Sequence, residues 1–379
     1  MKVALLSYST KPRGGVVHTL ALAEALAAAG VDVTVWTLGR GGDEGFFRPV
    51  DPRVRLAIVP FPDLAGEGVG PRVLRSIAVL RAAFGNAGYD IVHAQDCISA
   101  NAAGRCVRTV HHIDHFSTPE LAACHERAIV EPYAHVCVSA SVADELRAGW
   151  SLAATVIPNG VDADRFAAAT PDRRFGEYVL AVGGIEPRKG SLDLLDAFAL
   201  LRRRKPAVRL VIAGGETLFD YRDYRARWDA RAAELRVEPL VLGPVPHDEL
   251  PGLVAGAAAF AFPSTKEGFG LAAMEALAAG VPLVTRDLPV LREVFGSAAR
   301  FASEPNGFAD ALFAAMTEDD PVARVAGRDL AYRHTWAAAA ERHIKLYRRL
   351  SAVDAQPLDE FAQVLDGERG AVGGVRFLA

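Results

Sequence analysis

Two glutamates in one segment of the sequence could bind the hydroxyl groups of a carbohydrate. Glu267 and Glu275 lie in the stretch EGFGLAAMEALAAG, where Gly268 and Gly270 predict a turn that leads directly into a helix. Carboxylates accept paired hydrogen bonds from vicinal hydroxyls, and the free N–H groups at a helix start suit a diphosphate. An acidic helix start followed by a solvated glutamate would give the same two carboxylates. The glycines around them therefore favour a sugar-nucleotide site.

Two adjacent cations form a second candidate group. Arg188 and Lys189 lie in GGIEPRKG, a turn between the strand-like YVLAVGG and a helix that we expect to begin near Leu192. Fixed cations at such a turn could neutralise a leaving diphosphate, a task that often falls to magnesium. The alternative is a solvated surface turn. Since the acidic cluster at Glu318 to Pro321 lies outside the expected site turns, we predict chemistry without a metal ion or other cofactor.

A glycine pair near the start of the chain could approach a ligand. Gly14 and Gly15 in PRGGVVH permit close backbone approach, or they make a tight turn and nothing more. Their spacing lacks the G-x-G-x-x-G pattern of dinucleotide-binding folds. This difference argues against a dehydrogenase.

Three histidines end predicted strands on the expected ligand side: His93, His111 and His112. His112 could form a polar pair with Asp114. A lone histidine at a strand end is more often structural than catalytic, so each of the three is a candidate only.

The elements that must position these residues alternate between strands and helices. The apolar run Val3 to Tyr8 is followed by a helical pattern that Gly30 closes and by the strand-like VDVTVWTL, and this βαβ unit implies a parallel sheet. Loops are expected at Gly39 to Pro52 and Pro60 to Pro71. DIVHA, RTVHH and HVCVS suggest further strands, and a second alternating series starts near Glu177.

Two consecutive series predict an α/β fold of two Rossmann-like, doubly wound parallel-sheet domains that join near Ile157 to Asp162. Ligands of such sheets lie beyond the carboxyl ends of the strands, so an interdomain cleft is the expected site. The turns that should face it are Lys11 to Gly15, Gly183 to Gly190, Gly214 to Glu216 and Ser264 to Gly270.

Composition excludes several classes of protein. A net charge of -4, with acids and bases interleaved, offers no positive field for nucleic acid. Four apolar residues separate Lys2 from Ser7, whereas the apolar run of an export signal has about 7–15, so we expect a cytoplasmic protein. Arg72, Arg75 and Arg81 lie among apolar residues, but Arg81 falls opposite Arg72 on a helical wheel. We expect an ordinary surface helix there and at most weak peripheral membrane contact.

Taken together, these segments resemble the GT-B glycosyltransferases of family four, the glycosyl transferases group one. VIPNGVD, the turn that ends at Gly190, FPSTKEGFGLAAMEALAAGVP and LREVFG occur in matching order and spacing, and the resemblance runs to about Arg349. It implies a retaining enzyme that moves a hexose-type sugar from a nucleotide-diphosphate sugar to an acceptor that the sequence does not identify.

The resemblance also implies a division of the chain. Residues 1–160 would form the acceptor-side domain and residues 161–333 the donor-side domain. A helix at 334–350 would cross back to the first domain. Residues 351–379 match nothing in the family and stay unassigned.

Roles of individual residues follow from the resemblance. Arg188 and Lys189 would hold the donor diphosphate, Glu267 would orient the transferred sugar, and Glu275 would bind the ribose hydroxyls. His111 in TVHHID matches a histidine near the reacting centre, with His112 as the alternative. The resemblance also implies contacts of the backbone with the donor at Gly14, Gly15, Gly183, Gly268, Phe269, Gly270 and Leu271.

Two other functions fit part of the pattern. A GT-B-type sugar-nucleotide epimerase would also hold a diphosphate between its domains but would need no acceptor. A non-catalytic bilobal nucleotide-sugar-binding protein would keep the two sheets, but it has no need for the Arg188–Lys189 pair beside two glutamates. The sequence therefore favours a transferase, with fold analogy as supporting evidence only.

Overall fold

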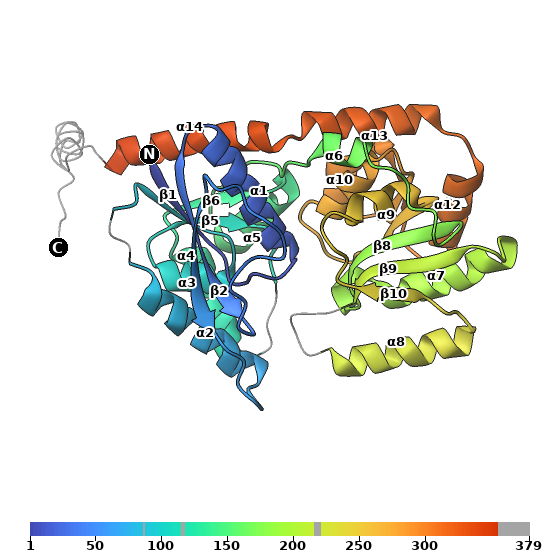
Figure 1. The fold of residues 1–379 in the computed structure, drawn as a ribbon, viewed down its shortest axis with the longest axis horizontal. Helices are drawn as coiled ribbons and strands as arrows, with labels where there is room; N and C mark the ends of the chain where they lie inside the picture. Colours follow the sequence, from blue (N-terminus) through green and yellow to red (C-terminus); the bar gives the residue numbers. More distant parts are fainter. Residues whose placement is uncertain (86–87, 115–117, 216–220, 355–379) are drawn as a thin grey trace, which may run out of the picture.

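The computed structural model describes residues 1–85, 88–114, 118–215 and 221–354, which form two α/β domains. Figure 1 shows the domains side by side, each with helices packed around a central sheet. Glu216, in one of the expected site turns, and the tail after residue 354 lie outside the described residues.

The N-terminal domain holds a seven-stranded sheet in the order β3-β2-β1-β4-β5-β6-β7. Its elements are β1 (Lys2–Leu6), α1 (Gly14–Ala28), β2 (Asp32–Arg40), β3 (Arg55–Phe61), α2 (Val69–Ala83), β4 (Ile91–Ala94), α3 (Cys97–Ala103), β5 (Val107–Val110), α4 (Pro119–Val130), β6 (Ala134–Cys137), α5 (Ala140–Trp150) and β7 (Thr155–Val156).

The C-terminal domain holds a six-stranded sheet in the order β10-β9-β8-β11-β12-β13. Its elements are α6 (Ala163–Ala167), β8 (Tyr178–Gly184), α7 (Ser191–Arg204), β9 (Arg209–Gly215), α8 (Arg222–Leu235), β10 (Leu240–Gly243), α9 (Leu250–Gly256), β11 (Ala259–Phe262), α10 (Leu271–Ala278), β12 (Leu283–Arg286), α11 (Pro289–Phe295), β13 (Ala299–Ala302), α12 (Pro305–Thr317) and α13 (Pro321–Arg333). The last helix among the described residues, α14 (Trp336–Asp354), follows it.

Each sheet consists of parallel strands, and the order in which the strands are added reverses at an inner strand. β1 pairs with β2 on one side and β4 on the other, and β8 pairs with β9 and β11 in the same way. Ligands of open α/β sheets bind at such switch points, beyond the carboxyl ends of the strands. The doubly wound two-domain fold expected from the sequence is therefore confirmed, and the predicted turns after β1, β8 and β11 lie at the switch points.

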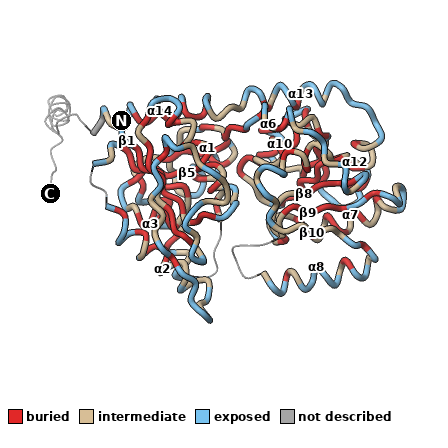
Figure 2. Tube along the Cα trace, viewed as in Figure 1, coloured by how far each residue is buried: buried red, intermediate tan, exposed pale blue. Residues whose placement is uncertain are grey.

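The strands at the centre of each sheet are buried. Every residue of β4, β5 and β11 is buried, as expected for parallel strands that helices cover on both faces. Figure 2 shows the buried residues concentrated in the two sheets, with exposed residues on the outer helices. Each domain therefore has its own core, and the site must lie at the strand ends.

Side-chain caps allow the chain to turn abruptly from strand to helix. Asp96 accepts a hydrogen bond from Ser99 N at 2.8 Å while Ser99 Oγ accepts one from Asp96 N at 3.0 Å, and this capping box starts α3 directly after β4. Ser139 caps α5 after β6 by accepting from Val142 N at 3.3 Å. Short turns of this kind leave the strand ends open toward the other domain.

The loop predicted at Pro60 to Pro71 is wrong at both ends. β3 extends through Pro60 to Phe61, and α2 already begins at Val69. Pro60 is opposite Gly39 of β2, and β3 is the outermost strand of its sheet. An edge strand tolerates proline because the missing N–H can face away from the ladder.

Two segments connect the domains and are bonded to each other. The first is residues 157–162, and the second is His334 with Thr335; Val161 N donates to the His334 carbonyl at 2.8 Å. After the second segment α14 packs against α1 of the N-terminal domain, with Ala340 and Tyr347 fully buried in that domain's core (Figure 1). This is the crossing that the resemblance implies; the boundaries given above stay predictions.

A carboxylate of one domain also caps a helix of the other. Glu293 on α11 accepts hydrogen bonds from Ala140 N at 2.7 Å and Ser141 N at 2.8 Å, both at the start of α5, and from Ser141 Oγ at 2.6 Å. Lys266 and Glu145 form a longer ion pair at 3.5 Å. These contacts hold the two domains against each other beside the predicted site turns.

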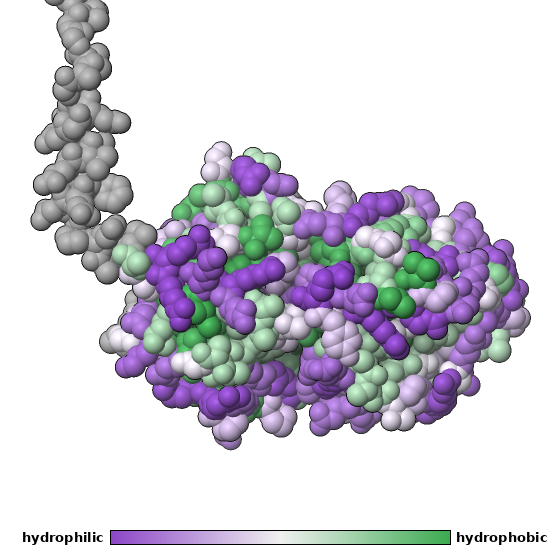
Figure 3. Space-filling model, turned by 90° about the horizontal axis from the view of Figure 1, so that it is seen from above, coloured by the Kyte–Doolittle hydropathy of each residue, from purple (hydrophilic) through white to green (hydrophobic). Residues whose placement is uncertain are grey.

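No described helix is both long and apolar enough to cross a membrane. On the face seen in Figure 3, hydrophobic residues form separate patches among hydrophilic ones. Arg75 pairs with Glu67 at 2.6 Å, and Arg81 donates to the Asn101 carbonyl at 2.5 Å, so intramolecular contacts already hold these side chains. Weak membrane contact stays an open prediction.

Gly160 should tolerate no side chain because the connecting segments pass so close to each other. A Cβ added there would lie 2.6 Å from Trp336 Cα and 2.7 Å from the Thr335 carbonyl carbon, both backbone atoms. We expect Gly160→Ala to destabilise the protein by about 1–3 kcal/mol, the range for overpacking. Thermal unfolding measures this loss, with Gly149→Ala, which has open space around its Cα, as the control. Equal midpoints for both variants would contradict the close crossing.

Candidate functional site

The two predicted cations and the first predicted glutamate meet in the structure. Arg188 and Lys189 lie in a short 3₁₀ turn after β8, and Glu267 lies in the loop between β11 and α10. Lys189 Nζ is 2.5 Å from Glu267 Oε1, and Arg188 Nη1 is 3.3 Å from the same oxygen. Thr265 N donates to the Arg188 carbonyl at 2.8 Å and ties the two turns together. The three charged groups therefore form one cluster at the ends of neighbouring strands.

The cations keep Glu267 ionised. Its side chain is 10% exposed, and burial alone disfavours the charged form. The Lys189 ammonium and the Arg188 guanidinium outweigh burial and lower the pKa of Glu267 to about 2. Burial likewise opposes the charge on Arg188, but neighbouring carboxylates raise its pKa. The turn is thus a partly buried ion cluster, and the solvated surface turn is excluded.

Two carboxylates of this cluster were missed or only partly recognised from the sequence. Glu186 Oε1 lies 3.0 Å from Arg188 Nη2, and its position inside GGIEPRKG was a signal that could have found it. Asp114 comes from the other domain. Burial alone would raise the pKa of Asp114. The hydrogen bond from His112 and the charge of Arg188 outweigh burial and lower this pKa to about 2. The Arg188 charge therefore acts across the domain boundary.

Gly268 marks a very close approach of the two domains. A Cβ added to Gly268 would overlap the carbonyl oxygen of His111. The His111 side chain in turn packs against α1, because a Cβ added to Gly15 would lie 3.9 Å from His111 Cδ2 and Nε2. His111 Nε2 is buried and has no hydrogen-bond partner. The structure thus brings His111, Gly15 and the Glu267 loop together; Gly14, beside Gly15, begins α1.

The other two candidate histidines have different surroundings. His112 Nε2 lies 3.2 Å from Asp114 Oδ2, so the predicted pair is confirmed. His93 does not lie on the expected ligand side and has the structural role that is more frequent for a histidine at a strand end. Its Nδ1 lies 2.6 Å from the hydroxyl of Tyr347 on α14, and its Nε2 lies 2.7 Å from Thr109 Oγ1. His93 therefore serves to dock α14.

The predicted helix start is present next to Glu267. α10 begins at Leu271, directly after Gly270. The N–H groups of its first turn therefore have no carbonyl partner within the helix. The Phe269 side chain is 3% exposed and belongs to the domain core, which leaves only its backbone for a ligand. The carbon chain of Lys189 lies against Gly183, where an added Cβ would be 3.4 Å from Cε.

Glu275 lies one turn inside α10 and apart from the charge cluster. Its strongest charged neighbours are Arg165 and Asp162, near α6. Burial raises the pKa of Glu275 to about 7, against a lowering by Arg165. The two predicted glutamates therefore differ. Cations stabilise the ionised form of Glu267, whereas burial disfavours the ionised form of Glu275, which a hydrogen-bond donor would stabilise.

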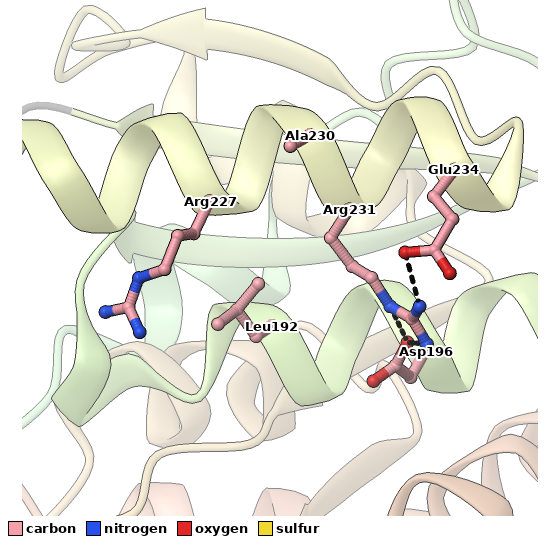
Figure 4. A pocket seen from close by; sticks show the side chains of 6 residues that line it. All are labelled: Leu192, Asp196, Arg227, Ala230, Arg231 and Glu234. Atoms are coloured by element: carbon pink, nitrogen blue, oxygen red, sulfur yellow. Dashed lines mark hydrogen bonds and ion pairs between the residues drawn. The ribbon is translucent and has the colours of Figure 1, made fainter.

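An open groove of about 350 Å³ lies elsewhere, between α7 and α8. Figure 4 shows its lining, with Arg231 between Asp196 and Glu234. The Arg231 guanidinium is 2.7 Å from each of these carboxylates, so its charge is already neutralised. None of the residues predicted for the site lines this groove. The charge cluster is therefore the better candidate for a binding site.

The chain contains one Asp-x-Asp sequence, Asp162-Ala163-Asp164. Asp162 caps α6 by accepting from Arg165 N at 3.3 Å, and Asp164 accepts a hydrogen bond from Tyr332. Within the described ranges, no three His, Cys, Asp or Glu side chains are grouped so that they could hold a metal ion. Both aspartates thus have local structural contacts.

Comparison with protein families gives two matches that together span most of the chain. The family described as glycosyltransferase family 4 matches residues 12–165, and the family described as glycosyl transferases group 1 matches residues 163–323. The two matches overlap at residues 163–165, directly after the first segment that connects the domains.

Individual relatives are consistent with these matches. The chain is 36% identical over 233 residues to a glycogen synthase from Mycobacterium tuberculosis, covering 59% of this chain and 55% of that protein. The alignment thus spans about half of the relative's length. A phosphatidyl-myo-inositol mannosyltransferase from Mycolicibacterium smegmatis is 28% identical over 380 residues, with 91% of this chain and 92% of that protein covered.

Solved structures show the same fold. A sucrose-phosphate synthase from Thermosynechococcus elongatus superposes with a TM-score of 0.75 at 19% identity, covering 93% of this chain and 99% of that one. HepE from Anabaena, in complex with UDP-glucose, gives a TM-score of 0.70 at 18% identity, covering 92% and 100%. The arrangement of the two domains is therefore that of the GT-B fold.

The raised pKa of Glu275 predicts a pH-dependent effect on stability. Because the folded pKa of about 7 lies above the ordinary value, the folded state holds a proton that the unfolded state releases, and stability falls as pH rises toward 7. We expect Glu275→Gln to be nearly neutral at about pH 5 and stabilising at about pH 8. Thermal unfolding at both pH values tests this, with the exposed Glu304→Gln as control. A pH-independent difference would show that Glu275 carries no buried charge.

Proposed function

The chain belongs to the GT-B glycosyltransferases of group 1, and on this premise we propose that it is a retaining hexosyltransferase that uses a nucleotide-diphosphate sugar and no metal ion. The observation that carries the proposal is the Arg188–Lys189–Glu267 cluster beside the close approach of Gly268 to the other domain. It combines cations for a diphosphate with a carboxylate for sugar hydroxyls.

The donor would bind by exchange of anions. Its diphosphate replaces the Glu267 carboxylate as the partner of Lys189 and Arg188, and the helix start at Leu271 adds N–H groups. Glu267, released from the cations, accepts hydrogen bonds from the hydroxyls of the transferred sugar. Glu275 accepts from the ribose hydroxyls, which stabilise its otherwise unfavourable charge.

In the proposed step one bond breaks and one forms on the same face of the sugar. The bond between the anomeric carbon and the diphosphate oxygen breaks, and the acceptor oxygen bonds to that carbon. The acceptor's hydroxyl proton passes to the departing diphosphate. Arg188 and Lys189 neutralise the charge that develops on the leaving group, and Glu267 orients the sugar without becoming a nucleophile. His111 lies next to the reacting centre from the acceptor-side domain.

The identity of the donor is a separate part of the proposal. HepE is in complex with UDP-glucose, and one relative is named a mannosyltransferase. Both support a hexose as the transferred sugar. A thermal-shift screen over UDP- and GDP-sugars identifies the donor because a ligand that binds the native state raises the unfolding temperature.

The two cations should supply the charge that a metal ion supplies elsewhere. We expect Lys189→Ala to lower turnover by about 10²–10³, comparable to the loss of one preorganised oxyanion donor. Arg188→Ala should behave similarly, and Arg188→Lys should recover only part of the rate because an ammonium lacks the bidentate fork. Activity should survive EDTA.

Nucleotide release with an acceptor found by screening measures these effects. Lys205→Ala is the matched control: Lys205 pairs with Glu177 at 2.7 Å outside the site, and its side chain is 20% exposed, like that of Lys189. Near-normal rates for both alanine variants of the cluster would refute the role of the cations. Loss of activity in EDTA that magnesium or manganese restores would refute metal independence.

Transfer should retain the configuration of the anomeric carbon. Front-face reaction leaves the new bond on the side that the diphosphate occupied, so the first-formed product has the anomeric configuration of the donor. NMR of the initial product, recorded before any mutarotation of a free sugar, reports this directly. An inverted linkage would be incompatible with the proposed step.

A further inference from the structure

A buried histidine outside the predicted set contacts His111. His18 lies on α1, one helical turn after Gly15, and is 1% exposed. The ring centroids of His18 and His111 are 4.7 Å apart with an angle of 80° between the planes, an edge-to-face contact. Since Gly15 also packs against the His111 ring, the same face of α1 contacts this ring twice.

His18 also contacts the first segment that connects the domains and the residue that directly follows the second. Its Nδ1 lies 2.9 Å from Asn159 Oδ1 in the first segment. Its ring lies 5.3 Å from the ring of Trp336, the residue at which α14 begins. Asn159 is itself buried, and the segments are bonded to each other two residues further on, from Val161 to His334. His18 therefore lies where the candidate site meets the connection between the domains.

Packing alone does not account for a histidine at this position. Because the Asn159 carbonyl oxygen can only accept, Nδ1 of His18 carries the proton. Burial, followed by the neighbouring His111 and His343, holds the pKa of His18 well below its usual range, so the ring is neutral. Its Nε2 is buried without a partner. An apolar side chain would fill the space without leaving a nitrogen unpaired.

We propose that His18 is a positioning residue for sugar transfer: it holds the His111 ring in the orientation that leaves Nε2 free, and it joins that ring to the connection between the domains. The proposal rests on the proposed function, in which His111 lies beside the reacting centre. His111 Nε2 is buried and without a partner, so its hydrogen-bonding capacity is unused in the ligand-free protein. A displacement of this ring by about 1 Å would affect the rate strongly, since such misplacements lower rates about 10²-fold.

Two substitutions separate the two contacts of His18. His18→Phe keeps a ring against His111 and Trp336 but loses the bond to Asn159, whereas His18→Asn keeps a donor near the Nδ1 position but loses the ring. We expect His18→Asn to lower kcat about 10–100-fold and His18→Phe to lower it less. The KM for the nucleotide sugar should stay within about 2-fold of wild type, because the C-terminal domain holds the donor.

His343 on α14 offers a matched control. It is also 1% exposed, its Nδ1 is bonded to the Ala339 carbonyl at 2.8 Å, and its Nε2 is buried without a partner. Its ring contacts are His93 and Tyr347. We expect His343→Asn to lower the unfolding temperature as His18→Asn does, but to leave kcat unchanged. Equal losses of kcat in the two variants, or no loss in His18→Asn, would overturn the proposal.

A second readout separates this proposal from the proposed function. In protein with ¹⁵N-labelled histidine rings, the His111 resonances should move in His18→Asn and stay in place in His343→Asn. If the wild type is active and these resonances do not move, only the positioning role of His18 fails. If the wild type transfers sugar from no nucleotide sugar, the proposed function fails and the positioning role fails with it.

Discussion

The charge balance around Glu267 is the constraint on which the site depends. A nearly buried carboxylate without a counter-charge would be unfavourable, and Lys189 and Arg188 remove that cost in the ligand-free protein. The reverse also holds, because two adjacent cations repel each other unless Glu267 and Glu186 neutralise them. An anionic ligand would therefore have to replace a carboxylate as the partner of these cations. The cations are already held in place by carboxylates when it does so, which is what a preorganised electrostatic site requires.

Backbone atoms, rather than side chains, set the distance between the two halves of the site. Gly268 follows Glu267 directly, and it lies so close to the His111 carbonyl that any side chain would overlap it. The charge cluster of one domain is therefore one residue away from contact with the other domain. Glu293 holds the two domains together next to this contact. Its carboxylate accepts hydrogen bonds from N–H groups at the start of α5 that have no partner within that helix.

Local sequence predicted those parts of the site that a single turn builds. Arg188, Lys189 and Glu267 each follow an apolar strand, and a parallel α/β sheet places such turns at one edge. Which cation pairs with which carboxylate could not be predicted, because Glu267 reaches the cations only when β11 lies beside β8. His93 shows the limit of the strand-end rule: alternation along β4 directs its side chain toward α14, away from the ligand edge. Pro60 was taken for a loop residue because local sequence does not reveal that its strand lies at a sheet edge.

The docking of α14 determines which part of the molecule can move. Tyr347 on α14 bonds to His93, and His93 bonds to Thr109, so a chain of hydrogen bonds lies under the helix. Burial holds the pKa of His93 well below its usual range, and the ring is neutral. Neutral hydrogen bonds fix the register of the helix without a buried charge whose desolvation would oppose docking. α14 thus belongs structurally to the N-terminal domain although it follows the C-terminal domain in the chain. Any change in the distance between the domains must therefore be absorbed in the two short segments that connect them.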